Sequence, residues 1–189
     1  MRLPADAAIL TVDETILRLF PPLRAAWAKR GAQAQVSVSG INDRRVLYGA
    51  INIRTGHRSV QIGRSMKLPE FHAFLEMLRR SYRGRPLWLL IDKHRSHTAP
   101  STLRLAARLG VRLLWLPKQS PELNAMDQLW RHLKQHIAAN RQYPTINDEA
   151  QAARAWVLAL TTATVLRLAG LKSKNNWLRR LSQNFRGHT

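Results

Sequence analysis

The chain has no cysteine, few acidic residues and no long apolar run. The absence of cysteine excludes disulfides, thiolate zinc sites and cysteine nucleophiles, so any catalysis must use other groups. No stretch approaches the roughly 18 consecutive apolar residues that a membrane-spanning helix needs, and the first eight residues do not resemble a secretion signal. We therefore expect a cytoplasmic protein that does not associate with membranes.

The scarcity of acid is matched by an excess of base. Among 189 residues there are 31 Lys and Arg but 11 Asp and Glu, which gives a formal net charge of +20. Such a chain repels itself strongly unless a polyanion is its usual partner. Nucleic acid is the expected partner, although charge alone says nothing about catalysis.

The hydrophobic pattern predicts strands first and alternating strands and helices later. Extended segments at residues 7–12, from 36 onward, at 45–53 and at 59–62 indicate an antiparallel meander. Helical spacing begins after Pro69, and buried strands at 86–91 and 111–116 then alternate with helices near 103–109 and 123–137. This order is that of an α/β, ribonuclease-H-like fold, with a mixed central sheet flanked by helices.

A break at Tyr143 and Pro144 separates the last predicted helices from this pattern. Thr145 with Asp148 resembles a helix-start pair, and one or two helices should follow to residue 168. Residues 172–189 are basic, and either a short amphipathic helix or a disordered tail fits them. We expect a catalytic domain at residues 1–142, and a C-terminal helical extension with a basic tail at 143–189.

Three aspartates fall at informative places in this order. Asp13 is expected at the end of the first strand, Asp92 at the end of the fourth, and Asp127 in the first turn of the helix after the fifth. Phosphodiester chemistry by two Mg²⁺ or Mn²⁺ ions about 4 Å apart needs oxygen ligands on rigid elements. Taken singly, each residue is more often a turn former, a helix cap or a helix-dipole partner.

Sequence motifs around these aspartates occur in three stretches. The first is VDET at residues 12–15, followed by Trp27 and Arg30; the second is LLID at 89–92, with His97 five residues later. The third is LPKQSPELNAMD at 116–127, with Trp130 and Lys134 after it. Together they resemble the DDE transposases of bacterial insertion sequences, a branch of the mariner-like superfamily, over about residues 12–135.

The resemblance identifies candidate site residues and shows departures from the family pattern. It implies that Asp13, Asp92 and Asp127 hold two Mg²⁺ or Mn²⁺ ions, with Asp127 in place of the Glu common in bacterial members. Lys93 replaces the usual Asn after Asp92, and Ala125 replaces the usual Pro.

Four other residues are candidates for supporting roles. His97 could position a phosphate or the third carboxylate, Asp127, and it could equally be an ordinary surface or capping residue. Asn124 is expected to cap the helix that presents Asp127. Lys93 would lie beside the metal site. Glu14 should point away from Asp13, because neighbouring side chains on a strand face opposite sides.

The family resemblance implies a DNA transposase catalytic domain. Such an enzyme hydrolyses the element end and then joins its 3′ hydroxyl to target DNA, as a homodimer on transposon-end and target DNA in the cytoplasm. Only twelve residues precede Asp13, so we expect a separate helix-turn-helix recognition domain or a truncated gene product. The alternatives are a nuclease of the same fold, such as a junction resolvase, and an inactive DNA-binding remnant.

Overall fold

The structure is a computed structural model that describes residues 6–23, 36, 38–117 and 120–174. Its centre is one five-stranded sheet in the order β3-β2-β1-β4-β5. Strands β1 and β2, and β2 and β3, pair antiparallel, whereas β4 is parallel to both β1 and β5. The strands are β1 Ala8–Arg18, β2 Arg44–Asn52, β3 Arg58–Gly63, β4 Leu87–Ile91 and β5 Val111–Trp115.

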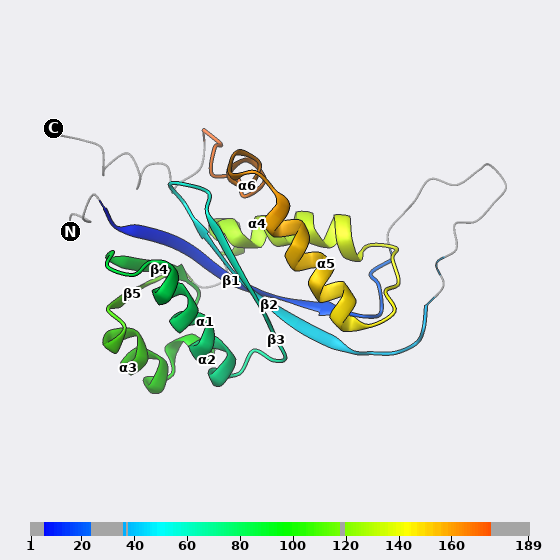
Figure 1. Ribbon diagram of the computed structural model, residues 1–189, viewed down its shortest axis with the longest axis horizontal. Coiled ribbons are helices and arrows are strands. Elements are labelled where there is room, and N and C mark those ends of the chain that lie inside the picture. The colour runs from blue at the N-terminus through cyan, green and yellow to red at the C-terminus, as the bar shows by residue number, and fades with distance from the viewer. Residues whose placement is uncertain (1–5, 24–35, 37, 118–119, 175–189) are drawn as a thin grey trace.

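Two layers of helices cover the sheet, one on each face (Figure 1). One layer contains α1 Leu68–Ser81, α2 Arg95–Thr98 and α3 Pro100–Arg108. The other contains α4 Ala125–Leu133, its π-helical continuation Lys134–Ala138, α5 Ile146–Ala159 and α6 Thr162–Leu168, after a short 3₁₀ turn at Pro121–Leu123. The predicted ribonuclease-H-like order and mixed sheet are therefore confirmed.

The alternation of side chains along β1 divides the core in two. Leu10 and Val12 pack in the α1 layer, whereas Ile9 and Leu17 pack in the α4 layer. Both layers present helical stripes that are nearly inaccessible to solvent: Phe71, Phe74, Leu75 and Leu78 from α1, and Met126, Leu129, Trp130 and Leu133 from α4. Because helices cover both faces of the sheet at β1, each polar side chain on this strand lies beneath one of the two helical layers.

The α4 layer approaches the sheet closely at Gly49 of β2. A Cβ atom added there would lie 2.3 Å from Cε of Met126 and 2.5 Å from Cζ2 of Trp130. Gly49 pairs with Asp13 across the β1–β2 ladder. A glycine is therefore required at the point where α4 passes the strand that carries Asp13.

Two details of the predicted strands were wrong. The segment beginning at Val36 forms no strand in residues 36 and 38–43, and Val38 and Ile41 are exposed, so burial does not select an extended pairing there. Asp13 also lies inside β1 and not at its end, because Thr15 and Leu17 continue the alternation and pair with β2 as far as Arg18.

The C-terminal region begins as predicted. Thr145 and Asp148 form a reciprocal capping box at the start of α5, and the buried face of α5 joins the core beneath α4. The proposed division between residues 142 and 143 stays a prediction. Most of the basic tail lies outside the described residues, and within them no helix is long and apolar enough to cross a membrane.

Candidate active site

Strand order brings Asp13 and Asp92 together. In the parallel β1–β4 ladder Thr11 pairs with Leu90, and two residues further along each chain are Asp13 and Asp92. Asp92 directly follows the last residue of β4, as predicted. Asp13, inside β1, and Asp92, directly after β4, therefore lie at neighbouring positions across this pair of parallel central strands.

The environment of Asp13 opposes a negative charge. Burial raises the pKa of its carboxyl to about 8, and the nearby carboxylates of Glu14, Asp127 and Asp92 contribute further in that order. Asp92 and Asp127 are thus both close enough to act on Asp13 electrostatically. A cation between these groups would remove the repulsion that now disfavours ionisation.

Asn124 connects the helix of Asp127 to the strand of Asp13. Its side-chain oxygen accepts hydrogen bonds from the Met126 amide and the Thr11 hydroxyl, and its Nδ2 donates to the Val12 carbonyl at 3.0 Å. The predicted helix cap is therefore confirmed, and the side chain is buried. These contacts fix the start of α4 beside Asp13.

Asp127 lies in the first turn of α4, as predicted. Its Oδ2 atom is buried and receives no hydrogen bond within the described chain, although Nη2 of Arg131 lies 2.8 Å away as an ion-pair partner. We interpret this contact as charge pairing without hydrogen-bond geometry. Asp127 consequently retains an oxygen that a cation can use.

The carboxylates do not form a closed ligand shell. Among the residues that the structure describes, no group of three or more His, Cys, Asp or Glu side chains is placed to hold a metal ion. Asp92 is held by His97, with 56% of its side chain exposed, and Asp127 is paired with Arg131. The three side chains share one region of the sheet but do not yet point at one centre.

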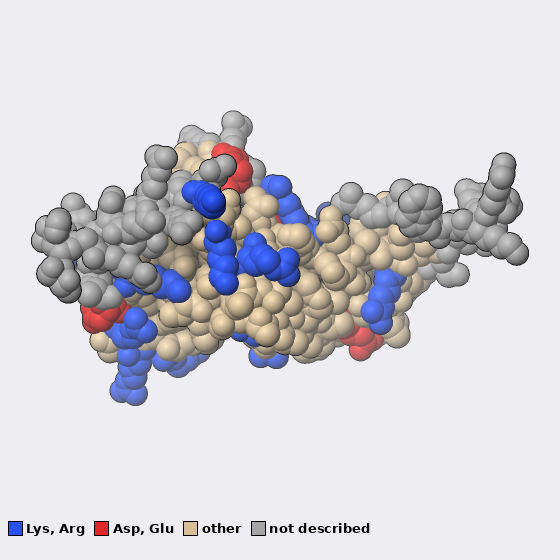
Figure 2. Space-filling view, turned by 90° about the horizontal axis from the view of Figure 1, so that it is seen from above, with Lys and Arg blue, Asp and Glu red and all other residues tan. Residues whose placement is uncertain are grey.

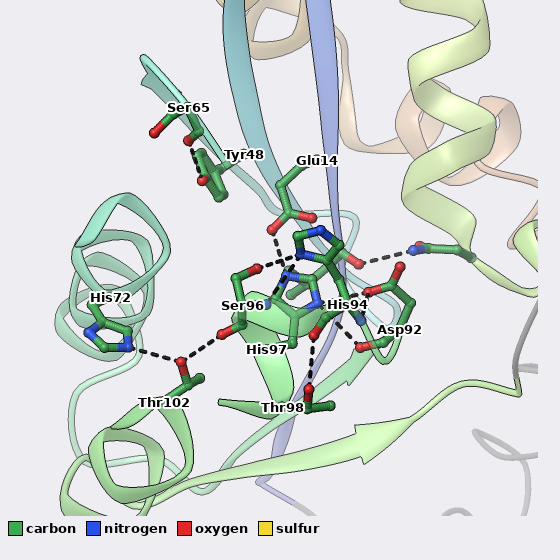
Figure 3. Close-up of polar contacts among 12 residues, drawn as sticks. Glu14, Tyr48, Ser65, His72, Asp92, His94, Ser96, His97, Thr98 and Thr102 are labelled. Carbon is green, nitrogen blue, oxygen red and sulfur yellow. Dashed lines mark hydrogen bonds and ion pairs between the residues drawn. The ribbon is translucent and has the colours of Figure 1, made fainter. Parts of the chain in front are cut away.

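His97 forms the best-connected polar contact in the site (Figure 3). Its Nδ1–H donates to Oδ1 of Asp92 at 2.7 Å, and its Nε2–H donates to Oε1 of Glu14 at 2.9 Å. The His97 side chain is 1% exposed and that of Glu14 is 4% exposed. A ring that donates from both nitrogens is an imidazolium, which suits a position between two carboxylates.

The two carboxylates outweigh the effect of burial on His97. Burial lowers its pKa, but hydrogen bonds to Asp92 and Glu14 raise it, with a net result of about 9. The hydrogen bond between His97 and Asp92 is also the main reason that the pKa of Asp92 is lowered. Asp92 is therefore ionised and is held in one orientation by His97, whereas the pKa of Asp13 is shifted in the opposite direction, upward.

Sequence reasoning placed Glu14 correctly but missed its partner. Glu14 does point away from Asp13, into the α1 layer, where His97 arrives from a position 83 residues later. Surface placement of His97 was wrong, because the ring is buried. Of the three aspartates, it contacts the second, Asp92, and not the expected third. Lys93 is exposed, and its predicted place beside the metal stays a prediction.

The chain matches the sequence pattern of the DDE superfamily endonucleases over residues 8–148. It is 30% identical over 140 residues to an uncharacterized 39 kDa protein of insertion element IS630 from Shigella sonnei, covering 73% of this chain and 41% of that protein. It is 33% identical over 79 residues to the Tcb2 transposase of Caenorhabditis briggsae, covering 39% of this chain and 29% of that one. The chain thus spans less than half of these relatives.

Solved structures share the fold at lower identity. The Mos1 mariner paired-end complex with Mg has a TM-score of 0.71 at 18% identity, covering 94% of this chain and 55% of that one. The catalytic domain of Mos1 mariner transposase has a TM-score of 0.65 at 16% identity, covering 94% and 82% respectively. The family predicted from the motifs is confirmed, and the chain belongs to the DDE superfamily of endonucleases.

Proposed function

We propose that this chain is the catalytic domain of a DNA transposase that cleaves element ends and joins them to target DNA. The proposal rests on the placement of three aspartates in a DDE endonuclease fold. Asp13 lies on β1 and Asp92 just after its paired strand β4, and Asn124 ties the helix of Asp127 to β1. Asp92 and Asp127 therefore both act electrostatically on Asp13. Elsewhere the chain is strongly basic, so this concentration of acid in one region needs a reason. Cation binding supplies it.

The residues present fit a divalent metal. Asp13 has a carboxyl that resists ionisation while its acidic neighbours are unscreened. Asp127 has a buried oxygen that accepts no hydrogen bond from the residues that the structure describes. Hard cations such as Mg²⁺ and Mn²⁺ prefer oxygen ligands of this kind. We infer that Asp13, Asp92 and Asp127 hold two ions, which would supply electrostatic stabilisation of the attacking and leaving oxygens.

The protein's own part in the reaction is to position these oxygens. His97 and the His94 amide both donate to Oδ1 of Asp92, so its Oδ2 remains the oxygen that can turn to a cation. Asn124 holds α4 against β1, so Asp127 approaches from a fixed helix end.

The surface supports DNA as the substrate. Figure 2 shows the side of the molecule that is uppermost in Figure 1. On that side, Lys and Arg side chains are more widespread than those of Asp and Glu. With a net charge of +20, several phosphates should be neutralised together. We expect duplex affinity to fall roughly 10³-fold or more between 50 and 200 mM salt, with little preference for sequence.

Recognition and assembly are proposed to involve parts beyond this chain. The curated relatives are longer than the matched region, which supports a separate helix-turn-helix domain for element ends. The structurally similar Mos1 mariner protein forms a paired-end complex, which supports two copies of this chain acting on paired ends. Sedimentation of the chain with and without end DNA tests the dimer.

The proposed activity is tested by incubating the chain with supercoiled plasmid and with a pre-cleaved, 3′-hydroxyl donor in Mg²⁺ or Mn²⁺. We expect metal-dependent nicking and strand transfer, and a loss of at least about 10²-fold for Asp92→Asn in a folded protein. The exposed variant Glu76→Gln is a matched control for removing one carboxylate.

The competing functions give different results in the same assay. A resolvase-like nuclease would cut DNA but would not join the donor strand. An inactive remnant would bind DNA without metal-dependent nicking. Full activity of folded Asp92→Asn would contradict the assignment of that residue.

A further inference from the structure

Asp92 is oriented by a chain of hydrogen bonds that begins at the buried Glu14, on the face of the sheet opposite to Asp13. Glu14 lies one residue after Asp13 on β1 and faces the α1 layer, whereas Asp92 follows β4. His97 spans the two, as Figure 3 shows. The contact connects residues 83 positions apart, so the tertiary fold and not local sequence brings them together.

His97 is itself held firmly, which a bridging residue requires. Its ring packs on Phe71 of α1, with 4.4 Å between centroids. The preceding residue is anchored as well, because the buried Thr102 hydroxyl donates to the Ser96 carbonyl at 2.7 Å. The contacts with Phe71 and, through Ser96, with Thr102 therefore hold the ring in the α1–α3 layer, and neither of them involves Asp92.

Glu14 is not placed to act as a metal ligand itself. Its carboxylate is almost fully buried, and one oxygen accepts the hydrogen bond from His97. Without that acceptor, Nε2 of His97 would be a buried donor with no partner at this position, and the ring would gain by turning or shifting. A shift of the ring would release Oδ1 of Asp92.

We propose that Glu14 is a positioning residue that acts through His97 to fix the orientation of Asp92 for cation binding. The inference rests on the proposed function, because it takes Asp92 to be a metal ligand. Partners that orient metal ligands typically affect metal affinity by about 10- to 100-fold when removed. Glu14 is one step further from the ion, so we expect an effect near the lower limit.

The test measures Mn²⁺ binding to the DNA-free chain, from the electron paramagnetic resonance signal of free Mn²⁺. We expect Glu14→Ala to weaken binding about 10-fold. Glu14→Gln keeps a neutral acceptor for His97, so its loss should be smaller. This variant also preserves the test if Glu14→Ala does not fold, and thermal melting establishes which variants are folded.

Two comparisons separate positioning from general destabilisation. Tyr48 pairs with Glu14 across the β1–β2 ladder, and its hydroxyl donates to the Ser65 carbonyl on the same face. Tyr48→Phe removes a buried polar contact there and should leave Mn²⁺ affinity unchanged. In a His97→Phe background, Glu14→Gln should have no further effect, because its route to Asp92 is already absent.

The possible failures are distinguishable. Wild-type Mn²⁺ affinity in Glu14→Ala and Glu14→Gln, with strong loss in Asp92→Asn, would overturn the role of Glu14 alone. An undiminished effect of Glu14→Gln in the His97→Phe background would overturn the route through His97. Unchanged Mn²⁺ binding in Asp92→Asn would instead overturn the proposed function on which the inference rests.

Discussion

The acidic residues on the two faces of β1 lie in opposite environments. On the α1 face, Glu14 is buried and its charge is matched by His97. On the α4 face, Asp13 lies among other carboxylates. Within the described part of the chain, Oδ2 of Asp127 has Arg131 as an ion-pair partner but accepts no hydrogen bond. Adjacent residues of one strand thus occupy a satisfied site and an unsatisfied one.

The difference shows how a sheet can combine rigidity with a site for a cation. The satisfied face is complete without a ligand and can therefore hold Asp92 in a defined orientation. The unsatisfied face has an energetic cost that a bound cation would remove. Substitutions on the two faces of β1 can show whether the energetic cost on one face and the rigidity of the other are separable.

The largest expected effect is a loss of stability as pH rises in the absence of metal. The folded-state pKa values of Asp13 (about 8), Glu149 (about 7) and His97 (about 9) are raised. Each of these groups stabilises the folded state most at a pH below its pKa in the unfolded chain. That stabilisation is lost as the pH rises through the folded-state pKa. The free energy of unfolding should therefore fall between pH 5 and pH 9, as denaturant titrations can measure.

Single substitutions can separate the contributions of Asp13 and Glu149 to this pH dependence of stability. At pH 9 without metal, Asp13→Asn should stabilise the protein by about 2 kcal/mol or more, since each pKa unit corresponds to about 1.4 kcal/mol. Glu149→Gln should flatten the profile near pH 7, because Glu149 is 2% exposed and its Oε1 has no hydrogen bond to any described residue. The exposed control Glu76→Gln should leave the profile unchanged. A flat wild-type profile would contradict the unsatisfied state of Asp13.

A smaller effect is expected from crowding the α4 face at Gly49. Gly49→Ala places a Cβ against Met126 and Trp130, which should cost about 1–3 kcal/mol and displace Asp127. Gly63→Ala is the matched control, because its Cβ would meet Tyr48 and Glu70 in the α1 layer. Chemical denaturation and Mn²⁺ titration should show weakened metal binding in Gly49→Ala alone. Equal metal affinities in the two folded variants would contradict a role for α4 placement.

The smallest effect concerns Arg131, which now pairs with Asp127. A metal ion must compete with this guanidinium, and exposed ion pairs contribute up to about 1 kcal/mol. Arg131→Ala should therefore raise Mn²⁺ affinity in the absence of DNA about 2- to 5-fold. Arg104→Ala on the α3 side removes the same charge and should leave Mn²⁺ affinity unaltered. Weaker Mn²⁺ binding in Arg131→Ala would show that the arginine assists the site.

Periodicity and order were sufficient to predict most of the fold. The alternation of short buried strands with helices placed Asp92 after β4 and Asp127 in the first turn of α4. The exposed segment around Val38 and Ile41 was mistaken for a strand, because local apolar spacing does not reveal whether another strand is available for pairing.

The site was less predictable than the fold. Side-chain alternation gave the direction of Glu14, but nothing near residue 14 indicates that His97 meets it from helix α2. Gly49 carries no side chain, so its closeness to α4 becomes visible only when the helix is in place. Contacts between distant segments therefore limit what pattern alone can show.

The central claim is that Asp13, Asp92 and Asp127 share divalent ions. Anomalous diffraction from crystals grown with Mn²⁺ measures this directly. We predict two manganese peaks about 4 Å apart, coordinated by oxygens of all three aspartates. Manganese bound elsewhere, or a filled site from which any of the three carboxylates is absent, would contradict the account.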